Sequence, residues 1–272
     1  MTTKEMMEIA LELAGLDYMP EDCSIIEESG DVRRILAGID MGSAELLTAK
    51  TLGYDCVARH HPQGPANMGL GQLEARDHRE IMIRAGVPIN IAQKTANPRK
   101  EKMDRGMLGG NLMASKQLAQ LLGIASICVH TPADLMVERG LAQRMTELEK
   151  RLERVSLKDI VDDICQVREF ASNPQGPKIA VGGEDSFAGR IYVIMSGGGA
   201  CTLEEYKAMI DAGVGTFVVM HMKPEVIDAL AEDGRCNVVI AGHMASDSYG
   251  FNRILDAWEA RGVEIKRIGG IV

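Results

Sequence analysis

Aromatic side chains are scarce in this sequence. They make up only 4% of its 272 residues, so there are few platforms on which nucleic-acid bases could stack. Positive charge is also in the minority, with 30 basic residues against 39 acidic ones and a formal net charge of −9. Binding to a phosphate backbone needs clustered Lys and Arg, and the basic stretch "KTANPRKEK" is explained more simply as a solvated loop. We therefore expect no nucleic-acid partner.

Long hydrophobic runs and paired cysteines are missing as well. No stretch approaches the roughly 18 apolar residues that a membrane span requires. The N-terminal segment "MTTKEMMEIALELAGL" lacks the basic start and apolar centre of a signal peptide. The six cysteines are widely spaced without a C-x-x-C pair, which argues against a disulfide framework and against a cysteine zinc site. We expect a cytoplasmic protein that has no membrane contact.

Short apolar runs alternate with helical patterns through most of the chain. Most of the helical patterns end in Gly, and Thr202 with Glu205 predicts a capping box. Such alternation predicts an α/β fold with mainly parallel sheets and crossover helices. Strands are expected at residues 34–40, 55–59, 88–92, 125–129, 178–181, 191–195, 216–220, 237–241 and 263–268, with helices between them at 43–53, 73–86, 112–123, 202–213, 223–234 and 251–262.

The middle of the chain breaks this alternation. Residues 133–170 are charged and helical in pattern, and "ASNPQGP" then interrupts them. We interpret this part as a connector between two α/β lobes. Lobe one covers about residues 1–132, the helical connector about 133–177, and a second α/β segment about 178–272. The C-terminal strand and helix could return to lobe one.

Five of the six histidines follow a predicted strand directly or within two residues. Because ligands bind at the carboxyl ends of parallel strands, this placement indicates a functional crevice. These histidines are His60, His61, His130, His221 and His243.

Carboxylates accompany the histidines in three places. "GID" ends in Asp40, "HTPAD" adds Asp134 and "GHMASD" adds Asp247. Imidazole and carboxylate together suit first-row divalent ions such as Zn, Fe or Mn. The candidates exceed what one tetrahedral ion requires, which favours two ions about 3.5–4 Å apart.

Each of these positions also has a purely structural explanation. Thr131 could be the N-cap of a helix in which Asp134 completes a capping box. Asp247 and Asp40 could cap the helices that follow them, and His221 could be a hydrogen-bonded histidine at the edge of the core. The adjacent histidines of "HHP" are harder to explain in this way, because two polar rings at the end of a buried strand need partners.

A glycine run, "MSGGGACTLEEY", follows one predicted strand and opens a helix. Backbone N–H groups there could bind a phosphate or carboxylate. The run matches neither common nucleotide-binding glycine motif, so it implies no nucleotide specificity. A tight turn with close backbone approach explains it equally simply. The candidate anion-binding residues are Ser196, Gly197, Gly198 and Gly199.

Taken together, these motifs resemble those of the NGG-interacting-factor-three-like family, whose members are also labelled GTP cyclohydrolase I type 2 homologues. In family order they read "GID" (38–40), "HHPQG" (60–64), "HTPAD" (130–134), "SGGG" (196–199) and "GHMASD" (242–247), and they span nearly the whole chain. The resemblance implies a two-lobed α/β fold that assembles as a toroidal homohexamer. It also implies a dinuclear metal centre between the lobes.

By motif, the resemblance assigns five metal ligands, which are His60, His61, Asp134, His243 and Asp247. Asp40 would support these ligands without binding metal, and His130 or His221 would move protons. Two features depart from the family pattern. The last acid is usually Glu rather than Asp, and the segment 92–116 is an addition that suggests a subgroup with a different substrate pocket.

A dinuclear centre of this kind supports hydrolysis, because two cations activate a bound water and polarise the bond that it attacks. We expect a metal-dependent hydrolase of a small phosphorylated or nucleotide-like substrate, with GTP cyclohydrolase activity as one specific version. One alternative is a non-catalytic metal-binding protein with a regulatory or assembly role. Another is an interaction scaffold built on the charged segment 137–169.

Overall fold

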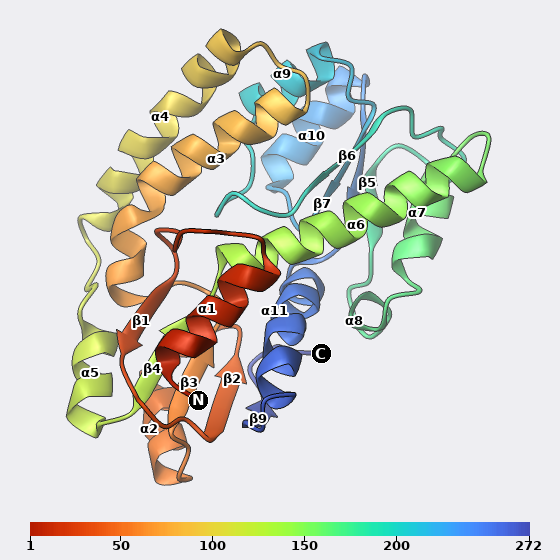
Figure 1. Cartoon of the computed structure of the whole chain (residues 1–272). Coiled ribbons are helices and arrows are strands. Elements are labelled where there is room, and N and C mark those ends of the chain that lie inside the picture. The colour runs from red at the N-terminus through yellow and green to blue at the C-terminus, as the bar shows by residue number, and fades with distance from the viewer. The chain divides into compact units, whose positions relative to one another are not determined.

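The computed structural model describes residues 1–272, and the chain divides into two compact units. Unit 1 contains residues 1–73, 101–136 and 247–271, and unit 2 contains residues 74–100, 137–246 and 272. Each unit has a mainly parallel sheet with helices (Figure 1), which confirms the predicted α/β class. The lobe boundaries expected from the sequence remain predictions.

The sheet of unit 1 has five strands in the order β1-β4-β3-β2-β9. All neighbouring pairs are parallel except β1 with β4. The last strand of the chain therefore lies beside β2, which is near its start. The strands are β1 (Ser24–Glu27), β2 (Arg34–Gly38), β3 (Cys56–Arg59), β4 (Ala125–Cys128) and β9 (Glu264–Arg267).

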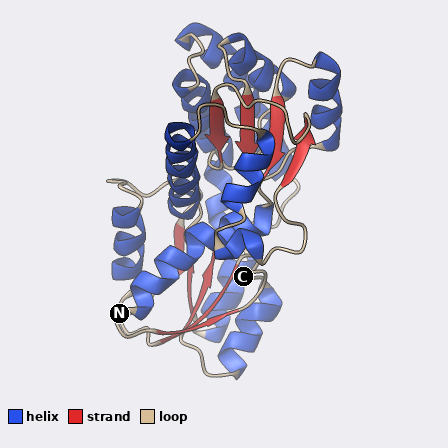
Figure 2. Cartoon of the chain, turned by 90° about the vertical axis from the view of Figure 1, so that its right-hand side faces the viewer, coloured by secondary structure: helices blue, strands red, loops and turns tan.

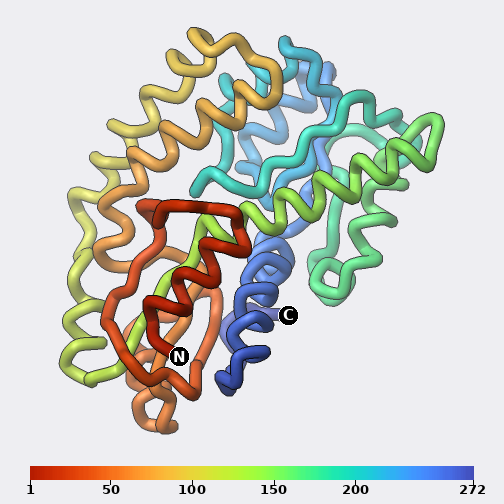
Figure 3. Tube along the Cα trace, in the orientation of Figure 1, coloured from red at the N-terminus to blue at the C-terminus, as the bar shows by residue number.

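Helices of unit 1 pack on this sheet and join the two ends of the chain. The indole N–H of Trp258 in α11 donates to the Met6 carbonyl of α1 at 3.1 Å, and Figure 3 shows the first and last helices side by side. Apolar residues of the sheet, including Leu36 and Val57, pack with Leu46 and Ala119 of two further helices. The elements are α1 (Thr3–Leu13), α2 (Ser43–Thr51), the 3-10 helix η1 (Gly64–Gly69), α5 (Ala114–Leu122) and α11 (His243–Glu259).

Unit 2 has a four-stranded sheet in the order β5-β8-β7-β6, with only β5 antiparallel to its neighbour. Figure 2 shows helices packed around these strands, and Tyr206 and Phe217 meet edge to face in the core. The strands are β5 (Lys178–Val181), β6 (Ile191–Ile194), β7 (Thr216–Val219) and β8 (Asn237–Ile240), and the helices are α7 (Leu157–Ile164), α8 (Arg168–Ala171), α9 (Leu203–Asp211) and α10 (Pro224–Asp233).

Three long helices carry the chain from one unit to the other, as does α11. They are α3 (Leu70–Arg84), α4 (Ile89–Met107) and α6 (Thr131–Arg151). Helices α3 and α4 run beside each other in opposite directions (Figure 3). None of the helices is both long and apolar enough to cross a membrane.

The expected strand at residues 88–92 is wrong, since α4 begins at Ile89. Ile89 and Ile91 are largely exposed, whereas Ala92 and Ala96 are buried, and this spacing of four is that of a helix. The loop expected for "KTANPRKEK" is wrong for the same reason, because α4 continues through Pro98. Strand β1 was missed, and only Ile26 of its four residues is buried.

Candidate metal centre

The two adjacent histidines stand just beyond the end of β3. The backbone N–H of His60 donates to the Gly38 carbonyl at 3.2 Å, and that of His61 donates to the Ile39 carbonyl at 3.1 Å. These bonds continue the pairing of β2 with β3 past the end of both strands. The ring centroids lie 5.1 Å apart, so the two imidazoles lie together at the carboxyl end of β3.

The turn after this pair is held by a buried arginine and a glycine. The guanidinium of Arg59 donates to Gln63 at 2.5 Å and to the Ser126 hydroxyl at 2.8 Å. Gly64 has a φ of +66°, and a Cβ there would come within 3.2 Å of the Leu112 carbonyl. The position therefore requires glycine, and the turn directs the chain away from the two rings.

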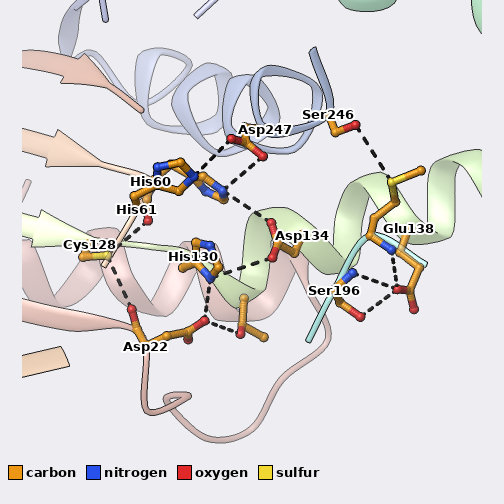
Figure 4. A network of polar contacts seen from close by, with 12 residues as sticks. Asp22, His60, His61, Cys128, His130, Asp134, Glu138, Ser196, Ser246 and Asp247 are labelled. Carbon is orange, nitrogen blue, oxygen red and sulfur yellow. Dashed lines mark hydrogen bonds and ion pairs between the residues drawn. The ribbon is translucent and has the colours of Figure 1, made fainter. Parts of the chain in front are cut away.

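Two buried carboxylates from different helices face His60 (Figure 4). Its Nε2 lies 3.4 Å from Oδ1 of Asp134 in α6 and 3.5 Å from Oδ1 of Asp247 in α11. Neither ring nitrogen of His60, nor Oδ1 of Asp134, has a hydrogen bond of good geometry. Buried polar atoms without partners are costly, so this convergence suits the binding of a cation.

The electrostatic field at His60 strongly favours positive charge. Burial by itself would lower the pKa of His60, but the carboxylates of Asp247 and Asp134 outweigh it and raise the pKa to about 10. A field that stabilises an imidazolium also stabilises a metal ion bound at the same atoms. His60, Asp134 and Asp247 present ligand atoms within 4.8 Å of one another, as do His60, His61 and His130.

A glycine brings the two carboxylates together. Helix α11 passes so close to the start of α6 that a Cβ on Gly250 would lie 2.1 Å from the Ala133 carbonyl oxygen. Asp134 follows Ala133 directly, and Asp247 lies one helical turn before Gly250. The missing side chain of Gly250 therefore sets the distance between the carboxylates that face His60.

His61 contacts two acids. Its Nε2 lies 3.3 Å from Oδ2 of Asp247, and its Nδ1 lies 2.7 Å from Oδ1 of Asp40. Because Asp40 holds the other ring nitrogen, it can fix the orientation of His61. The alternative of Asp40 as a helix cap is wrong, since Gly42 is the N-cap of α2.

Sequence reasoning missed Asp22, which is fully buried beside His130 (Figure 4). Its Oδ2 lies 2.7 Å from Nδ1 of His130 and accepts from the Thr131 hydroxyl at 2.7 Å. Burial raises the pKa of Asp22, but the bond to His130 and its charge outweigh this and lower it. The carboxylate fixes the ring, whose centroid lies 4.5 Å from that of His60. No local motif marks Asp22, because its partner is 108 residues away.

The capping alternatives for the other two acids do not match the helix boundaries. Thr131 is the first residue of α6, and its hydroxyl donates to Asp22 instead of capping. Helix α11 begins at His243, so Asp247 lies in its second turn. Both acids are buried, and although Asp134 lies in the first turn of α6, neither Asp134 nor Asp247 is a helix cap.

His243 and His221 both belong to unit 2. His243 starts α11 four residues before Asp247, a spacing that places the two side chains on one face of the helix. The ring of His221 lies 4.5 Å from that of His243. His221 is thus a neighbour of a proposed ligand.

The glycine run forms a tight turn in unit 2 between β6 and α9. Gly197 and Gly198 both have positive φ values of +108° and +78°. The N–H and hydroxyl of Ser196 donate to Glu138 at 3.0 Å and 2.7 Å (Figure 4), and so does the N–H of Met195. The turn thus binds a carboxylate of this chain, which an external anion would have to replace at Ser196.

A second buried histidine cluster, also missed from the sequence, lies in unit 2. Nδ1 of His78 lies 3.1 Å from Oε2 of Glu205 and 3.6 Å from Sγ of Cys201. Arg99, which lies within residues 92–116, donates to Glu205 at 3.0 Å and to Glu74 at 2.8 Å. The sequence does not mark His78 as a site residue, because it lies inside a helical pattern rather than after a strand. The capping box of Thr202 with Glu205 is confirmed.

Comparison with solved structures places this fold in a known class. A NIF3 superfamily protein from Sphaerobacter thermophilus is 32% identical, with a TM-score of 0.94 over 99% of this chain and 98% of the other. Reduced HcgD from Methanocaldococcus jannaschii is 14% identical, with a TM-score of 0.60 over 98% of this chain and 97% of the other, and shares the fold. A Bacillus cereus protein related to NIF3 is 12% identical with a TM-score of 0.50, covering 98% and 96% of the two chains.

No family model matches the sequence, and no curated protein does. The identity and coverage of the Sphaerobacter protein nevertheless decide the family. The chain belongs to the NIF3 superfamily, the family of the NGG-interacting factor three that its motifs resemble.

Proposed function

We propose that the His60 centre binds two first-row divalent metal ions and that the protein is a metal-dependent hydrolase. The observation that carries this proposal is the convergence of His60 with Asp134 and Asp247, whose facing atoms lie 3.4–3.5 Å apart in a buried site. Imidazole nitrogen and carboxylate oxygen are the ligands that Zn, Fe and Mn accept together. The proposed ligands are His60, His61, Asp134, Asp247 and, one turn before Asp247, His243.

The other residues of the centre hold the ligands and move protons. Asp40 and Asp22 fix the rings of His61 and His130 through short contacts of 2.7 Å. His130, and His221 beside the proposed ligand His243, are the candidates to accept or donate a proton during turnover. A bound divalent ion would supply an activated water and polarise the bond under attack. Five ligands leave open positions on two ions, which favours catalysis over a purely structural role.

We propose a small phosphorylated or nucleotide-like molecule as the substrate, with GTP cyclohydrolase chemistry as the specific version that the family label suggests. The turn at Ser196, Gly197, Gly198 and Gly199 would bind its anionic group after displacing Glu138. We also propose a cytoplasmic homohexamer, in line with the resemblance. Light scattering of the purified chain tests that assembly.

The function is tested with metal-loaded wild type and the His60→Ala/His61→Ala variant assayed side by side. Phosphoesters, cyclic amides and nucleotides serve as substrates, and we expect turnover of at least one class that the double variant lacks. Cooperative thermal unfolding of the variant shows that its fold is intact. If the loaded wild type hydrolyses none of them, the hydrolase assignment fails. A non-catalytic metal-binding protein, the second candidate, would still hold metal under those conditions.

A further inference from the structure

The second histidine cluster, formed by His78, Cys201 and Glu205, is the strongest feature that the proposed hydrolase leaves unused. These three side chains, together with Glu74, are buried within unit 2, so they serve no surface role. Each of the three offers a ligand atom within 4.8 Å of the other two. We propose that they form a separate zinc site in unit 2.

The spacing of the donor atoms fits a tetrahedral zinc ion. Bonds of about 2.3 Å to sulfur and 2.0–2.1 Å to nitrogen at a tetrahedral angle separate those atoms by about 3.5 Å. Sγ of Cys201 lies 3.6 Å from Nδ1 of His78. The carboxylate of Glu205 also lies next to this nitrogen, with its Oε2 3.1 Å away; the oxygen left for the ion is its other one, Oε1. An ion can therefore enter with small side-chain shifts.

The histidine is oriented as a metal ligand. Nε2 of His78 lies 2.9 Å from the Gly199 carbonyl, and donating to a backbone oxygen is the usual way in which a ligating imidazole is fixed. The other nitrogen then faces a carboxylate and a thiol. Because imidazole nitrogen and carboxylate oxygen both carry lone pairs, this close approach requires a cation or a proton between them.

The two carboxylate oxygens of Glu205 differ in their hydrogen bonds. Its Oε2 accepts from the Thr202 N–H at 2.7 Å and from Arg99 at 3.0 Å. Its Oε1 is buried and has no hydrogen-bond partner. A buried carboxylate oxygen without a partner is costly, and a zinc bond to Oε1 would satisfy it without breaking the helix cap.

Charge balance is consistent with a divalent ion despite the nearby Arg99. With Cys201 as thiolate, the cluster has three negative charges, from Cys201, Glu205 and Glu74, and one positive charge on Arg99. A divalent cation neutralises the remaining two. Binding then releases two protons to solvent, one from Nδ1 of His78 and one from the thiol. The sequence has no C-x-x-C pair, and this site needs only one cysteine.

Cobalt provides the test, because thiolate–cobalt bonds absorb in the near ultraviolet while a centre of histidines and carboxylates does not. The metal-free wild-type chain is titrated with Co²⁺ and then with Zn²⁺. We expect the thiolate band with wild type, and its displacement by zinc. Cys201→Ser should lack the band, and Cys236→Ser, which changes another buried thiol of the same core, should retain it.

A second variant separates ligation from folding. Glu205→Gln keeps the shape of the side chain, and we expect zinc affinity at this site to fall by more than about tenfold. A band that is absent from correctly folded wild type, or that persists in Cys201→Ser, overturns the zinc site. The two sites are tested independently. His60→Ala/His61→Ala should lose metal binding at the His60 centre and still show the cobalt–thiolate band, so a failure of the zinc site leaves the proposed hydrolase untouched.

Discussion

The two units each bury a histidine among acids, but the surrounding charges differ. In unit 1, the side chains of Asp22, Asp40, Asp134 and Asp247 contact three histidines. In unit 2, Glu74 and Glu205 share Arg99, and Glu205 also contacts a single histidine. The first cluster therefore has a larger unbalanced negative charge, and it offers more imidazole ligands.

The charges around the ligands, and not the residue types alone, therefore determine how many ions each cluster should bind. Arg99 already neutralises part of the second cluster, so we expect one ion there, bound through a thiolate. The first cluster has acids in excess, and Asp22 and Asp40 hold its rings, which is why we propose two ions there. A substitution in one cluster leaves the other cluster unchanged as an internal reference.

Among three substitutions around the His60 centre, Gly250→Ala should disturb stability and metal binding most. Its Cβ would overlap the Ala133 carbonyl, so α11 must move away from α6. We expect a loss of about 1–3 kcal/mol in the free energy of unfolding and weaker metal binding at the His60 centre. The cobalt–thiolate band of unit 2 should stay. Gly106→Ala is the matched control, because a Cβ there meets nothing within 4 Å. Equal stability of the two variants would contradict the close approach.

Asp22→Asn should have the second-largest effect on metal binding at the His60 centre. The amide keeps the shape of the side chain but no longer supplies the charge that holds Nδ1 of His130 at 2.7 Å. The variant loses a buried negative charge and the fixed His130 ring beside His60, so we expect the metal affinity of unit 1 to fall about 10–100-fold, measured by competition with a chelating dye. An unchanged affinity would mean that Asp22 does not support metal binding at the centre.

Asp40→Asn should have the smallest effect of the three. Asp40 makes an equally short contact, 2.7 Å to His61, but its side chain is 69% exposed whereas that of Asp22 is fully buried. Solvent screens exposed charges, so the affinity should fall less than in Asp22→Asn. The same competition assay compares them, and a larger loss in Asp40→Asn would reverse the ranking.

Local patterns predicted most of the strands, and they predicted that five of the six histidines follow the ends of strands. The alternation of strands and helices predicted the α/β class. The parallel pairing of β2 with β3 explains why "HHP" lies at the carboxyl end of the sheet. The pattern at residues 88–92 failed because a short apolar run fits a strand or a helix equally well. Only the burial of Ala92 and Ala96 reveals the helix.

Long-range packing accounts for what could not be predicted. Asp22 meets His130, and Glu205 meets His78, across 108 and 127 residues, so neither pair has a local signature. The role of Gly250 depends on the path of a second helix and is equally invisible in the chain. The Thr202 capping box was predictable because both of its partners lie within one helical turn.

Metal content per chain tests the central claim most directly. Wild type and His60→Ala/His61→Ala are compared in a Cys201→Ser background, so that the second cluster does not contribute. After gentle purification without chelator, we predict about two first-row ions per chain with the two histidines present and close to none without them. Equal metal content in the two proteins, or a content near zero in both, would contradict the assignment of the His60 centre.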